Sequence, residues 1–595
     1  GAILASESCQ NDIIPIASEF DRGLVSRPVV NVLYPQAVPN TPVIDRERCV
    51  HFLTDRCAVC QDVCEAGAID FEQVEEHLDL NVGAIVLGAG YEQFDARLKL
   101  EYGYGRFPNV VTSPEFERIL SASGPYAGHL VRPSDKTVPQ KIAFLQCVGS
   151  RDVDCGRRYC SSVCCMFATK EAVVAREHEP GIDCHIFFMD IRAFGKEFDK
   201  YYERAKEEYK VKYNRCRVSS VEQIWGSDDL LIRYETESGE LKEERYNLVV
   251  LATGLTPPPG IRDIAGTLDL EINEHGFLQT DRYIKEKTSK EGIYVCGALS
   301  EPKDIPATVA ESSAAAALAS GILSEVRGSL IKEKVYPEER DVSDEEPRIG
   351  VFVCHCGINI ASTVNVEEVA TRVRNLPNVV FSERNLYSCS EDTQTKIQGK
   401  IKEHQLNRVV ISSCTPRTHE PLFQDTIREA GLNPCLLEFV NIREHCSWVH
   451  QTEKEAATEK AIQLVTMAVA KAELLRPLHH SSSPVTQKAL VIGGGISGIS
   501  ATLSLAKQGF EVYLVEKENE LGGNARHLYY TLEGAEFQTL LKDKIAAVNN
   551  SPNIHIHTAS RIKNISGCVG NYKTTLLTEG SASPIELEHG AVIVA

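Results

Sequence analysis

The sequence lacks the features of a membrane-spanning or secreted protein. It contains no run of 18 or more apolar residues, so it predicts no membrane-spanning helix. Its opening residues, Gly1 to Leu4, have neither the basic start nor the long apolar segment of a signal peptide. We therefore expect a cytoplasmic location.

An excess of basic residues is also missing. The 63 Lys and Arg residues are outnumbered by 83 Asp and Glu residues, which gives a net charge of −20. Binding of nucleic-acid phosphates needs a basic face, so nucleic acid is not expected as the main partner. We interpret the acidic balance as a contribution to solubility.

Cysteine, by contrast, is plentiful, with 20 in 595 residues. The length predicts three to five domains, and 43% apolar residues suffice for ordinary cores. The cysteines gather in groups of three to five, whereas small secreted scaffolds space them as disulfide pairs. Thiols grouped in this way suit the reducing cytoplasm of an anaerobe.

One group of cysteines is especially dense. Cys147, Cys160, Cys164 and Cys165 follow one another at offsets of 13, 4 and 1. Four thiols this close in a cytosolic enzyme indicate metal binding or redox work. Zinc sites favour pairs two to four residues apart, whereas an adjacent pair with two outlying partners favours an iron–sulfur cluster. The alternative is packing, because free cysteine is commonly buried.

The motifs around these cysteines resemble those of a known family. QCVGSRD, YCSSVCCMFATKEA and FFMDIRAFGKEF are similar to the flavin and iron–sulfur domain of the heterodisulfide reductase A subunits. The resemblance covers nearly the whole chain in a shifted order. It implies that the four thiols bind a [4Fe–4S] cluster beside the flavin. Lys170 matches the family's lysine near the reactive flavin nitrogen and is the expected catalytic residue, while Cys155 lies outside the four-thiol pattern.

Residues 79–331 are predicted to form an α/β FAD and [4Fe–4S] domain. Its expected fold is doubly wound, of the Rossmann type and thioredoxin-reductase-like. Three short apolar runs end in glycine, as buried parallel strands do where they turn at a ligand. The last is followed by an Ala-rich helix, 307–324, whose N-terminus is expected to face the flavin. The expected cofactor-binding residues are Gly88, Gly90, Gly254, Gly297, Lys303, Asp304 and Ile305.

Residues 1–78 are predicted to be a partial ferredoxin-like module. Cys49, Cys57, Cys60 and Cys64 resemble a bacterial ferredoxin motif, in which the fourth cysteine ligates the neighbouring cluster. Cys9 stands where the fourth cysteine of an earlier run is expected. One cluster, bound by Cys9, Cys49, Cys57 and Cys60, is therefore expected. Cys64 would belong to a second, neighbouring cluster, but alanines occupy two of the ligand positions of that cluster. Zinc is the alternative, although seven residues between the first two thiols is a long spacing.

Residues 332–347 are rich in charge and are predicted to be a linker, and residues 348–478 a separate α/β unit. The unit resembles the N-terminal domain of the same family, which carries a further [4Fe–4S] cluster. Cysteines placed after strands can meet at one sheet edge. Five compete for four positions, namely Cys354, Cys356, Cys389, Cys414 and Cys446. Cys435 is attributed to packing in a Leu-rich strand, and His355 and His419 are further candidates, although exposed or capping histidines are commoner.

Residues 485–595 contain the clearest nucleotide-binding signal. An apolar strand leads into a glycine-rich turn and a helix, 497–509, and an acidic residue follows the second strand. Glycines permit the approach of a pyrophosphate, the helix N-terminus stabilises its charge, and the acid accepts from ribose hydroxyls. With the trailing Gly-Gly, the pattern favours FAD over NAD. The expected cofactor-binding residues are Gly493, Gly495, Gly498, Glu516, Gly522 and Gly523.

The order of these segments is the reverse of the family's order. The simplest account is an internal piece of a tandem protein, with the C-terminal part of copy one in residues 79–331 and the head of copy two from residue 348. Under this account residues 485–595 are an incomplete Rossmann segment of copy two. An alternative is that residues 485–595 fold onto 79–331 and complete one FAD domain, as in a circular permutation.

We predict an electron-transfer flavoprotein with iron–sulfur clusters. The resemblance implies electron bifurcation within an oligomeric complex, whose other subunits carry thiol-disulfide, hydrogenase or formate-dehydrogenase chemistry, with ferredoxin as a further partner. One alternative is a pyridine-nucleotide-dependent flavin disulfide reductase, which needs a second complete glycine fingerprint that the sequence does not show. The other is a non-catalytic scaffold that carries clusters.

Overall fold

The fold is known from a computed structural model, which describes residues 16–34, 37, 41–62, 64, 69–479, 481–532, 534–581 and 583–595. The predicted ligand Cys9 lies outside the described residues. Helices and mainly parallel sheets alternate along the chain, so the expected α/β class is confirmed. Within the described residues, no helix is long and apolar enough to cross a membrane.

Residues 79–331 are built around a parallel sheet with the strand order β10-β9-β8-β14-β7. Its central strands are largely apolar and buried because helices and a second sheet cover both faces. The strands are β7 (Val110–Thr112), β8 (Lys141–Val148), β9 (Asp183–Phe188), β10 (Lys212–Arg215) and β14 (Leu248–Thr253). One face carries the helices α4 (Ser113–Leu120), α5 (Cys164–His178) and α6 (Phe198–Glu207). The other carries an antiparallel sheet of β11 (Ser220–Gln223), β12 (Leu230–Glu235) and β13 (Leu241–Tyr246).

A smaller layer completes this part of the chain. Two glycine-ended strands, β5 (Ile85–Leu87) and β16 (Ile293–Val295), pair in parallel, and β6 (Glu92–Gln93) pairs with β15 (Leu255–Thr256). The helix α7 (Ile261–Leu268) packs beside them, and α8 (Ile305–Ile322) follows β16, close to the predicted range 307–324. The turn between β16 and α8 therefore lies beside the ends of both glycine-ended strands.

The N-terminal module is small. It contains the strand pairs β1 (Ile16–Ala17) with β2 (Ser26–Arg27) and β3 (Val30–Asn31) with β4 (Val43–Ile44), and the short helices α2 (Val50–Thr54) and α3 (Val59–Asp62). The turn between β1 and β2 docks on α4. There the Arg118 guanidinium pairs with Asp21 at 2.9 Å and lies over the Phe20 ring at 4.2 Å. This contact joins the module to helix α4 of residues 79–331.

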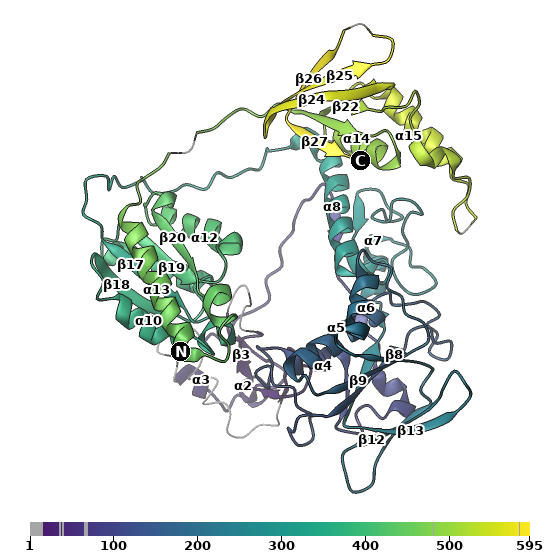
Figure 1. Cartoon of the computed structure of the whole chain (residues 1–595), viewed down its shortest axis with the longest axis vertical. Helices are drawn as coiled ribbons and strands as arrows, with labels where there is room; N and C mark the ends of the chain where they lie inside the picture. Colours follow the sequence, from purple (N-terminus) through teal and green to yellow (C-terminus); the bar gives the residue numbers. More distant parts are fainter. Residues whose placement is uncertain are drawn as a thin grey trace.

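Residues 348–478 form a parallel sheet with the order β18-β17-β19-β20, covered by helices (Figure 1). The strands are β17 (Ile349–Cys354), β18 (Val379–Asn385), β19 (Arg408–Ser413) and β20 (Leu437–Asn441). The helices are α9 (Ile358–Ala361), α10 (Val366–Val373), α11 (Glu391–Glu403), α12 (Pro416–Glu429) and α13 (Lys454–Glu473). Because parallel strands end at one edge, this sheet brings the segments after β17, β18 and β19 together.

Two details of this unit differ from expectation. Cys435 lies in a short 3-10 turn, Pro434–Leu436, before β20, because Asn433 caps the Cys435 N–H and closes the turn. The predicted linker is partly docked: Val342 is fully buried in the core of the unit, and Tyr336 donates to Asp425 at 2.6 Å. One buried apolar side chain and one tyrosine hydrogen bond thus anchor a segment that otherwise has the composition of a linker.

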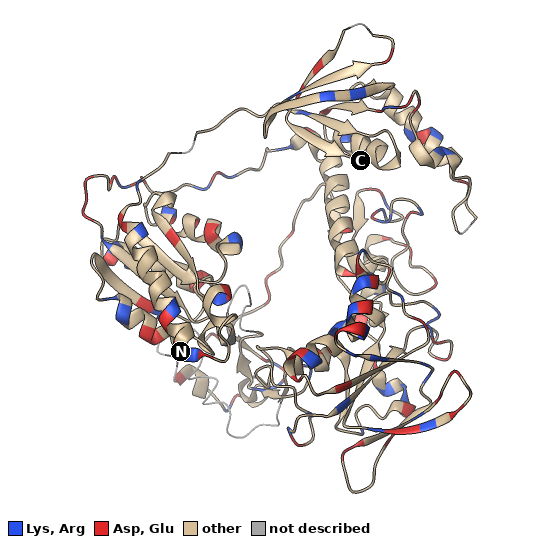
Figure 2. Cartoon of the chain, viewed as in Figure 1, with Lys and Arg blue, Asp and Glu red and all other residues tan. Residues whose placement is uncertain are grey.

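Residues 485–595 form a parallel sheet, β23-β22-β21-β27, and an antiparallel one, β24-β25-β26. The parallel strands are β21 (Lys488–Ile492), β22 (Glu511–Val515), β23 (Ile554–His557) and β27 (Ala591–Val594). The others are β24 (Ser560–Cys568), β25 (Asn571–Thr578) and β26 (Ile585–His589), and the helices are α14 (Ile496–Lys507) and α15 (Gln538–Asn550). Figure 2 shows Lys and Arg interspersed with Asp and Glu along α15 and along α4 to α6.

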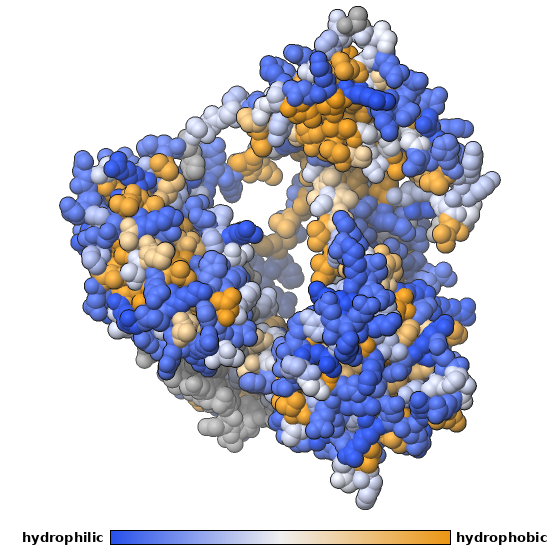
Figure 3. Space-filling model, viewed as in Figure 1, coloured by the Kyte–Doolittle hydropathy of each residue, from blue (hydrophilic) through white to orange (hydrophobic). Residues whose placement is uncertain are grey.

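This last unit rests on α8. Helices α14 and α8 are in contact, and the Arg327 guanidinium donates to the Gln508 carbonyl at 2.5 Å. The parallel sheets nevertheless stay separate, because β27 and β22 occupy both edges of β21 while β5 pairs with β16. Figure 3 shows apolar side chains at the surface of this unit. Ile305 of α8 and Val594 of β27 are exposed.

Candidate cluster and flavin site

The loop after β8 carries the dense cysteine motif. Cys147, Gly149 and Ser162 have positive φ angles of 61°, 69° and 64°. Gly149 is required there, because a Cβ would lie 2.0 Å from the buried Phe94 ring. Gly254, after β14, packs equally closely, since its Cβ would lie 2.8 Å from Ser150 and Ser161. Gly254 therefore lets the strand end lie against the cysteine loop and is not among the residues that line the neighbouring cavity.

The four thiols of the motif converge. Burial, together with Cys165 and Cys160, raises the pKa of the Cys147 thiol to about 11. Burial raises the pKa of Cys164 well above its usual range, and Cys147, Cys165 and Cys160 all contribute. Thiols interact in this way only at short range, so the folded loop gathers residues up to 18 positions apart in the sequence.

This donor set fits a cluster. Buried thiols ionise when a metal supplies positive charge, and thiolates are the ligands of iron–sulfur clusters. Within the described part of the chain, no three Cys, His, Asp or Glu side chains are close enough to hold a single metal ion.

Basic groups lie beside these thiols. Arg151 forms an ion pair with Asp190, and its guanidinium interacts with Cys147 and Cys160. Cys165 lies close to the Asp190 carbonyl, with Sγ and O 3.7 Å apart. The positive charge of Arg151 is placed to stabilise thiolate charge.

A cavity of about 790 Å³ lies beside the cysteine loop. Six of the predicted cofactor-binding residues line it: Gly88, Gly90, Gly297, Lys303, Asp304 and Ile305. Gly90 and Gly297 have φ angles of 75° and 71°, and no atom lies within 4 Å of a Cβ built on Gly90. Backbone without side chains on this wall leaves room for a flat ring or a phosphate, so the cradle fits a flavin nucleotide.

The cavity and the thiols share one helix end. Ser162, Val163, Met166 and Phe167 line the cavity, and they flank or follow Cys164 and Cys165 at the start of α5. A ring in the cavity and a group on these thiols would therefore be neighbours.

Lys303 holds the turn that leads into α8. Its ammonium, on a side chain only 6% exposed, donates to Ser300 Oγ at 2.8 Å and pairs with Glu311. Glu311 in turn accepts from the Gly297 N–H at 3.1 Å. Asp304 caps α8 by accepting from the Ala307 N–H. Two predicted cofactor-binding residues thus shape the cavity wall through contacts within the protein.

Lys170, the predicted catalytic residue, lies one turn further along α5. Its ammonium pairs with Glu117 of α4, and its side chain is 48% exposed. Glu117 lines the cavity, whereas Lys170 is outside the lining set. The structure therefore places the lysine at the cavity through its carboxylate partner.

In residues 348–478, four of the five candidate cysteines interact. A hydrogen bond from Cys356 lowers the pKa of Cys354 to about 5 and raises that of Cys356. Cys389 and Cys414 both act on Cys356 and are themselves influenced by Cys354. Cys446 is fully buried in the apolar core, where burial raises its pKa to about 11 and Lys460 opposes the shift.

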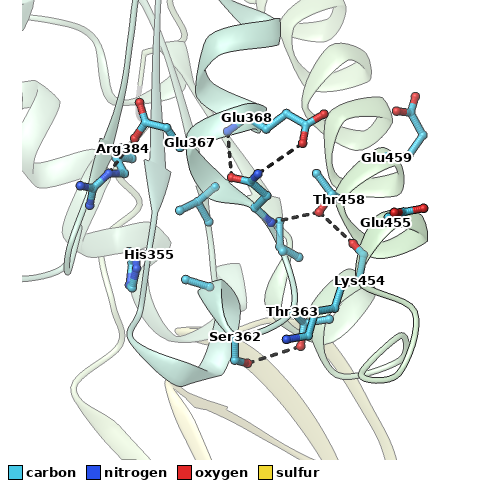
Figure 4. A pocket seen from close by; sticks show the side chains of 14 residues that line it. His355, Ser362, Thr363, Glu367, Glu368, Arg384, Lys454, Glu455, Thr458 and Glu459 are labelled. Atoms are coloured by element: carbon cyan, nitrogen blue, oxygen red, sulfur yellow. Dashed lines mark hydrogen bonds and ion pairs between the residues drawn. The ribbon is translucent and has the colours of Figure 1, made fainter.

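The same unit contains a polar pocket of about 720 Å³ (Figure 4). His355, between Cys354 and Cys356, lines it, and its buried Nδ1 has no hydrogen-bond partner within the described residues. The other labelled side chains come mainly from α10 and α13, including Glu368, Lys454 and Thr458. His419, the other candidate, lies half-buried in the first turn of α12.

The glycine-rich turn after β21 has the geometry of a dinucleotide site. A Cβ on Gly498 would lie 1.8 Å from the Gly493 carbonyl oxygen, so the helix can approach the turn only with glycine there. Glu516 accepts from the Gly494 N–H at 2.6 Å, and the Gly522 N–H donates to the Gly494 carbonyl. Gly493, Gly495 and Glu516 line a cavity of about 410 Å³, while Gly523 packs against Gly495.

The N-terminal thiols are only partly described. Cys49 caps the start of α2, Cys60 lies on α3, and both are buried. Cys57 and Cys64 are half-buried.

Sequence reasoning missed several residues of the main cavity, namely Arg22, Glu117, Arg118, Glu171 and Cys296. Glu171 had a detectable signal, because it is an acid among small and apolar residues of one helix. Arg22 had no such signal, because it belongs to the N-terminal module and is far in sequence from the other residues of the cavity.

Comparisons with known proteins agree with this fold. Residues 182–317 match the family model described as pyridine nucleotide-disulphide oxidoreductase, and residues 491–539 match an NAD(P)-binding Rossmann-like domain. A thioredoxin reductase of T. acidophilum aligns with 41% of this chain and 66% of its own, at 13% identity and a TM-score of 0.28. Two stretches of the chain are thus similar to dinucleotide-binding domains of oxidoreductases.

The chain is homologous over more than half of its length to the A subunits of heterodisulfide reductases, as its motifs predicted. It is 40% identical over 344 residues to the iron-sulfur A subunit of the CoB–CoM heterodisulfide reductase of Methanocaldococcus jannaschii, covering 57% of this chain and 51% of the relative. The A subunit of the H(2):CoB-CoM heterodisulfide,ferredoxin reductase of Methanothermobacter thermautotrophicus is 37% identical over 346 residues, covering 57% and 50%. An iron-sulfur A subunit of Methanopyrus kandleri is 50% identical over 232 residues, covering 39% and 35%. The chain spans about half the length of the first two relatives.

Proposed function

We propose that this chain is an electron-transfer iron–sulfur flavoprotein subunit of a heterodisulfide-reductase-like complex in an anaerobic cytoplasm. The observation that carries the proposal is the start of α5, where Cys164 and Cys165 adjoin residues that line the 790 Å³ cavity. In this proposal FAD occupies the cavity, and Cys147, Cys160, Cys164 and Cys165 hold a [4Fe–4S] cluster.

Bound FAD would exchange electron pairs, and the clusters would pass single electrons. The chain's own residues would orient the flavin and set its electrostatics. The glycine turns line the cavity, and so does Glu117, which forms an ion pair with Lys170. The positive charge of Lys170 is proposed to stabilise negative charge on the reduced flavin.

Further clusters are proposed at two other thiol groups. Cys354, Cys356, Cys389 and Cys414 are the proposed ligands in residues 348–478, because these four interact with one another. Cys49, Cys57, Cys60 and Cys9 are proposed for the N-terminal module, with Cys64 assigned to a neighbouring cluster. Electrons would pass among these sites and the flavin.

We propose flavin-based electron bifurcation as the overall activity. The printed name of the Methanothermobacter relative couples a heterodisulfide with ferredoxin, and two acceptors of this kind are what bifurcation requires. The proposed partners are subunits with thiol-disulfide, hydrogenase or formate-dehydrogenase chemistry, and ferredoxin.

We also propose that the chain joins parts of two copies of this type of subunit. Gly83 to Leu87 reads GAIVL and Gly590 to Val594 reads GAVIV, and both form a strand of a parallel pair. Two versions of one strand are expected from two copies, whereas a single permuted FAD domain needs only one. A GxGxxG run in the gene upstream of Gly1 is the expected result, and its absence would favour permutation.

Metal and flavin analysis of the anaerobically purified chain tests the main proposal. Cys164→Ala and Cys165→Ala should each lose about four iron atoms, one [4Fe–4S] cluster, whereas the matched control Cys155→Ala should lose none. Unchanged iron in the first two variants would reject the four-thiol site. Iron without FAD would indicate a scaffold.

A second candidate function is a pyridine-nucleotide-dependent flavin disulfide reductase, which the family match over residues 182–317 favours. Cys296 lines the cavity and supplies one thiol. Rapid reduction of the bound flavin by NADH or NADPH, with little iron present, would support this candidate over the electron-transfer role.

A further inference from the structure

Glu171 is a buried carboxyl in the wall of the main cavity. It lies on α5 six residues after Cys165, and only 1% of it is exposed. Its Oε2 accepts a hydrogen bond from Ser113 Oγ at 3.0 Å, at the start of α4. A carboxylate withdrawn from water in this way is costly unless a cation pairs with it.

The neighbouring cation is engaged elsewhere. Lys170 pairs with Glu117, so a second negative charge stands close to Glu171. Burial raises the pKa of Glu171 well above its usual range, Glu117 raises it further, and Ser113 and Lys170 oppose the shift. Burial and the nearby Glu117 charge thus favour the protonated form of the carboxyl.

Two further cations of the cavity wall are paired with carboxylates of their own. Arg118 pairs with Asp21, and Lys303 pairs with Glu311. The charged residues lining the cavity, besides Glu171 itself, are Arg22, Glu117, Arg118, Lys303 and Asp304.

We propose that Glu171 is the residue that donates a proton into the flavin cavity, a proposal that rests on FAD binding there. For each electron pair that clusters or a chemical reductant deliver to the flavin, the O–H bond of the Glu171 carboxyl breaks and its proton passes to the flavin. The carboxylate then takes one proton from water. The balance is two electrons from the reductant and one proton from water, with Glu171 restored.

The route from water to Glu171 runs past Glu117. This residue interacts with Glu171, lines the cavity, and has a side chain 39% exposed. A carboxyl that contacts both solvent and the cavity can pass a proton from water to the buried Glu171. Proton donors of this kind contribute about 10²–10⁴-fold to a rate.

A purely structural role would be a hydrogen bond that ties α5 to α4. Glutamine keeps that bond, since its amide oxygen can accept from Ser113, but it cannot release a proton. Glu171→Gln therefore separates the two roles, and Glu171→Asp keeps the acid. Glu177→Gln is the matched control, because Glu177 is exposed on the same helix.

The test uses the anaerobically purified full chain with its flavin. Reduced-minus-oxidised infrared spectra should contain a difference band from the carbonyl stretch of a neutral carboxylic acid. This band should be present in wild type and Glu177→Gln and absent from Glu171→Gln. Stopped-flow reduction by dithionite should slow by about 10²-fold or more in Glu171→Gln and lose its solvent isotope effect, with partial recovery in Glu171→Asp.

An unchanged carbonyl band and an unchanged rate in Glu171→Gln would overturn the proposal. Should Glu171→Gln not fold, Ser113→Ala replaces it: loss of the hydroxyl donor should shift the same band, and an unshifted band would also overturn the proposal. Absence of FAD from the wild-type chain would instead refute the proposed function, so the two failures are distinguishable.

Discussion

Lys303 and Glu311 form an ion pair inside the wall of the main cavity, with Nζ and Oε2 2.5 Å apart. Their side chains are 6% and 16% exposed. Glu311 also accepts from the Gly297 N–H, so the pair links the turn after β16 to α8. The cavity wall thus depends on a contact between a residue that precedes α8 and one on the helix itself.

Glu311→Ala should lower the free energy of unfolding by about 3–5 kcal/mol, because it leaves the Lys303 ammonium buried without its partner. It should also weaken FAD binding, measured by flavin retention on gel filtration. Lys285→Ala is the control: its pair with Glu301 is about half exposed and should contribute no more than about 1 kcal/mol. Equal effects of the two variants in urea unfolding would contradict the assignment.

Gly149→Ala should destabilise the cysteine loop more than Gly156→Ala. Both glycines have a φ of 69°, so an alanine costs about 1–2 kcal/mol of backbone strain at either position. Only at Gly149 does the new Cβ strike the Phe94 ring, which adds about 1–3 kcal/mol of overpacking. Urea midpoints and iron content should both fall further for Gly149→Ala, and similar midpoints would show that the Phe94 contact is unimportant.

Cys389→Ala and Cys446→Ala should differ in their effect on the iron content of residues 348–478. Cys389 interacts with the other thiols, so its loss should remove about one [4Fe–4S] cluster of iron. Cys446 is a core residue, so its loss should leave the iron content unchanged and cost about 1 kcal/mol through a small cavity. Iron loss in Cys446→Ala would reassign the ligand set.

Gly498→Ala and Gly495→Ala should separate packing from ligand approach. A Cβ on Gly498 meets the Gly493 carbonyl, so this variant should destabilise residues 485–595 in thermal unfolding. No atom lies within 4 Å of a Cβ on Gly495, so that variant should fold normally and bind dinucleotide more weakly, measured by FAD titration. Unaltered FAD affinity in Gly495→Ala would argue against a phosphate at this turn.

Glu171 should give stability a pH dependence of unusual sign. Its pKa is raised in the folded protein, so its contribution to stability is complete below the unfolded pKa of about 4.3 and is lost as pH rises toward the folded value. The slope reaches about 1.4 kcal/mol per pH unit for one proton. As pH rises above the unfolded pKa of about 4.3, the free energy of unfolding of wild type should therefore fall more steeply than that of Glu171→Gln, and parallel slopes would show that the pKa of Glu171 is not raised on folding.

Local structure followed the sequence closely where the determinants are local. The helices predicted at 307–324 and 497–509 are observed at Ile305–Ile322 and Ile496–Lys507. Caps, glycines and helix-forming residues act within one or two turns, so the chain itself carries this information. The prediction of a strand at Cys435 was wrong, because an Asn-Pro turn overrode its apolar neighbours.

The sequence by itself determined the class of the fold, the glycine turns and the family to which more than half of the chain is homologous. Tertiary structure alone decided which four thiols of residues 348–478 meet, because their distances depend on strand ends far apart in the chain. It also decided that Glu171 is buried and bonded to Ser113, while Lys170, its neighbour in sequence, is half-exposed and pairs with Glu117. Burial and charge pairing are properties of packed surfaces, and adjacent residues on a helix point in different directions.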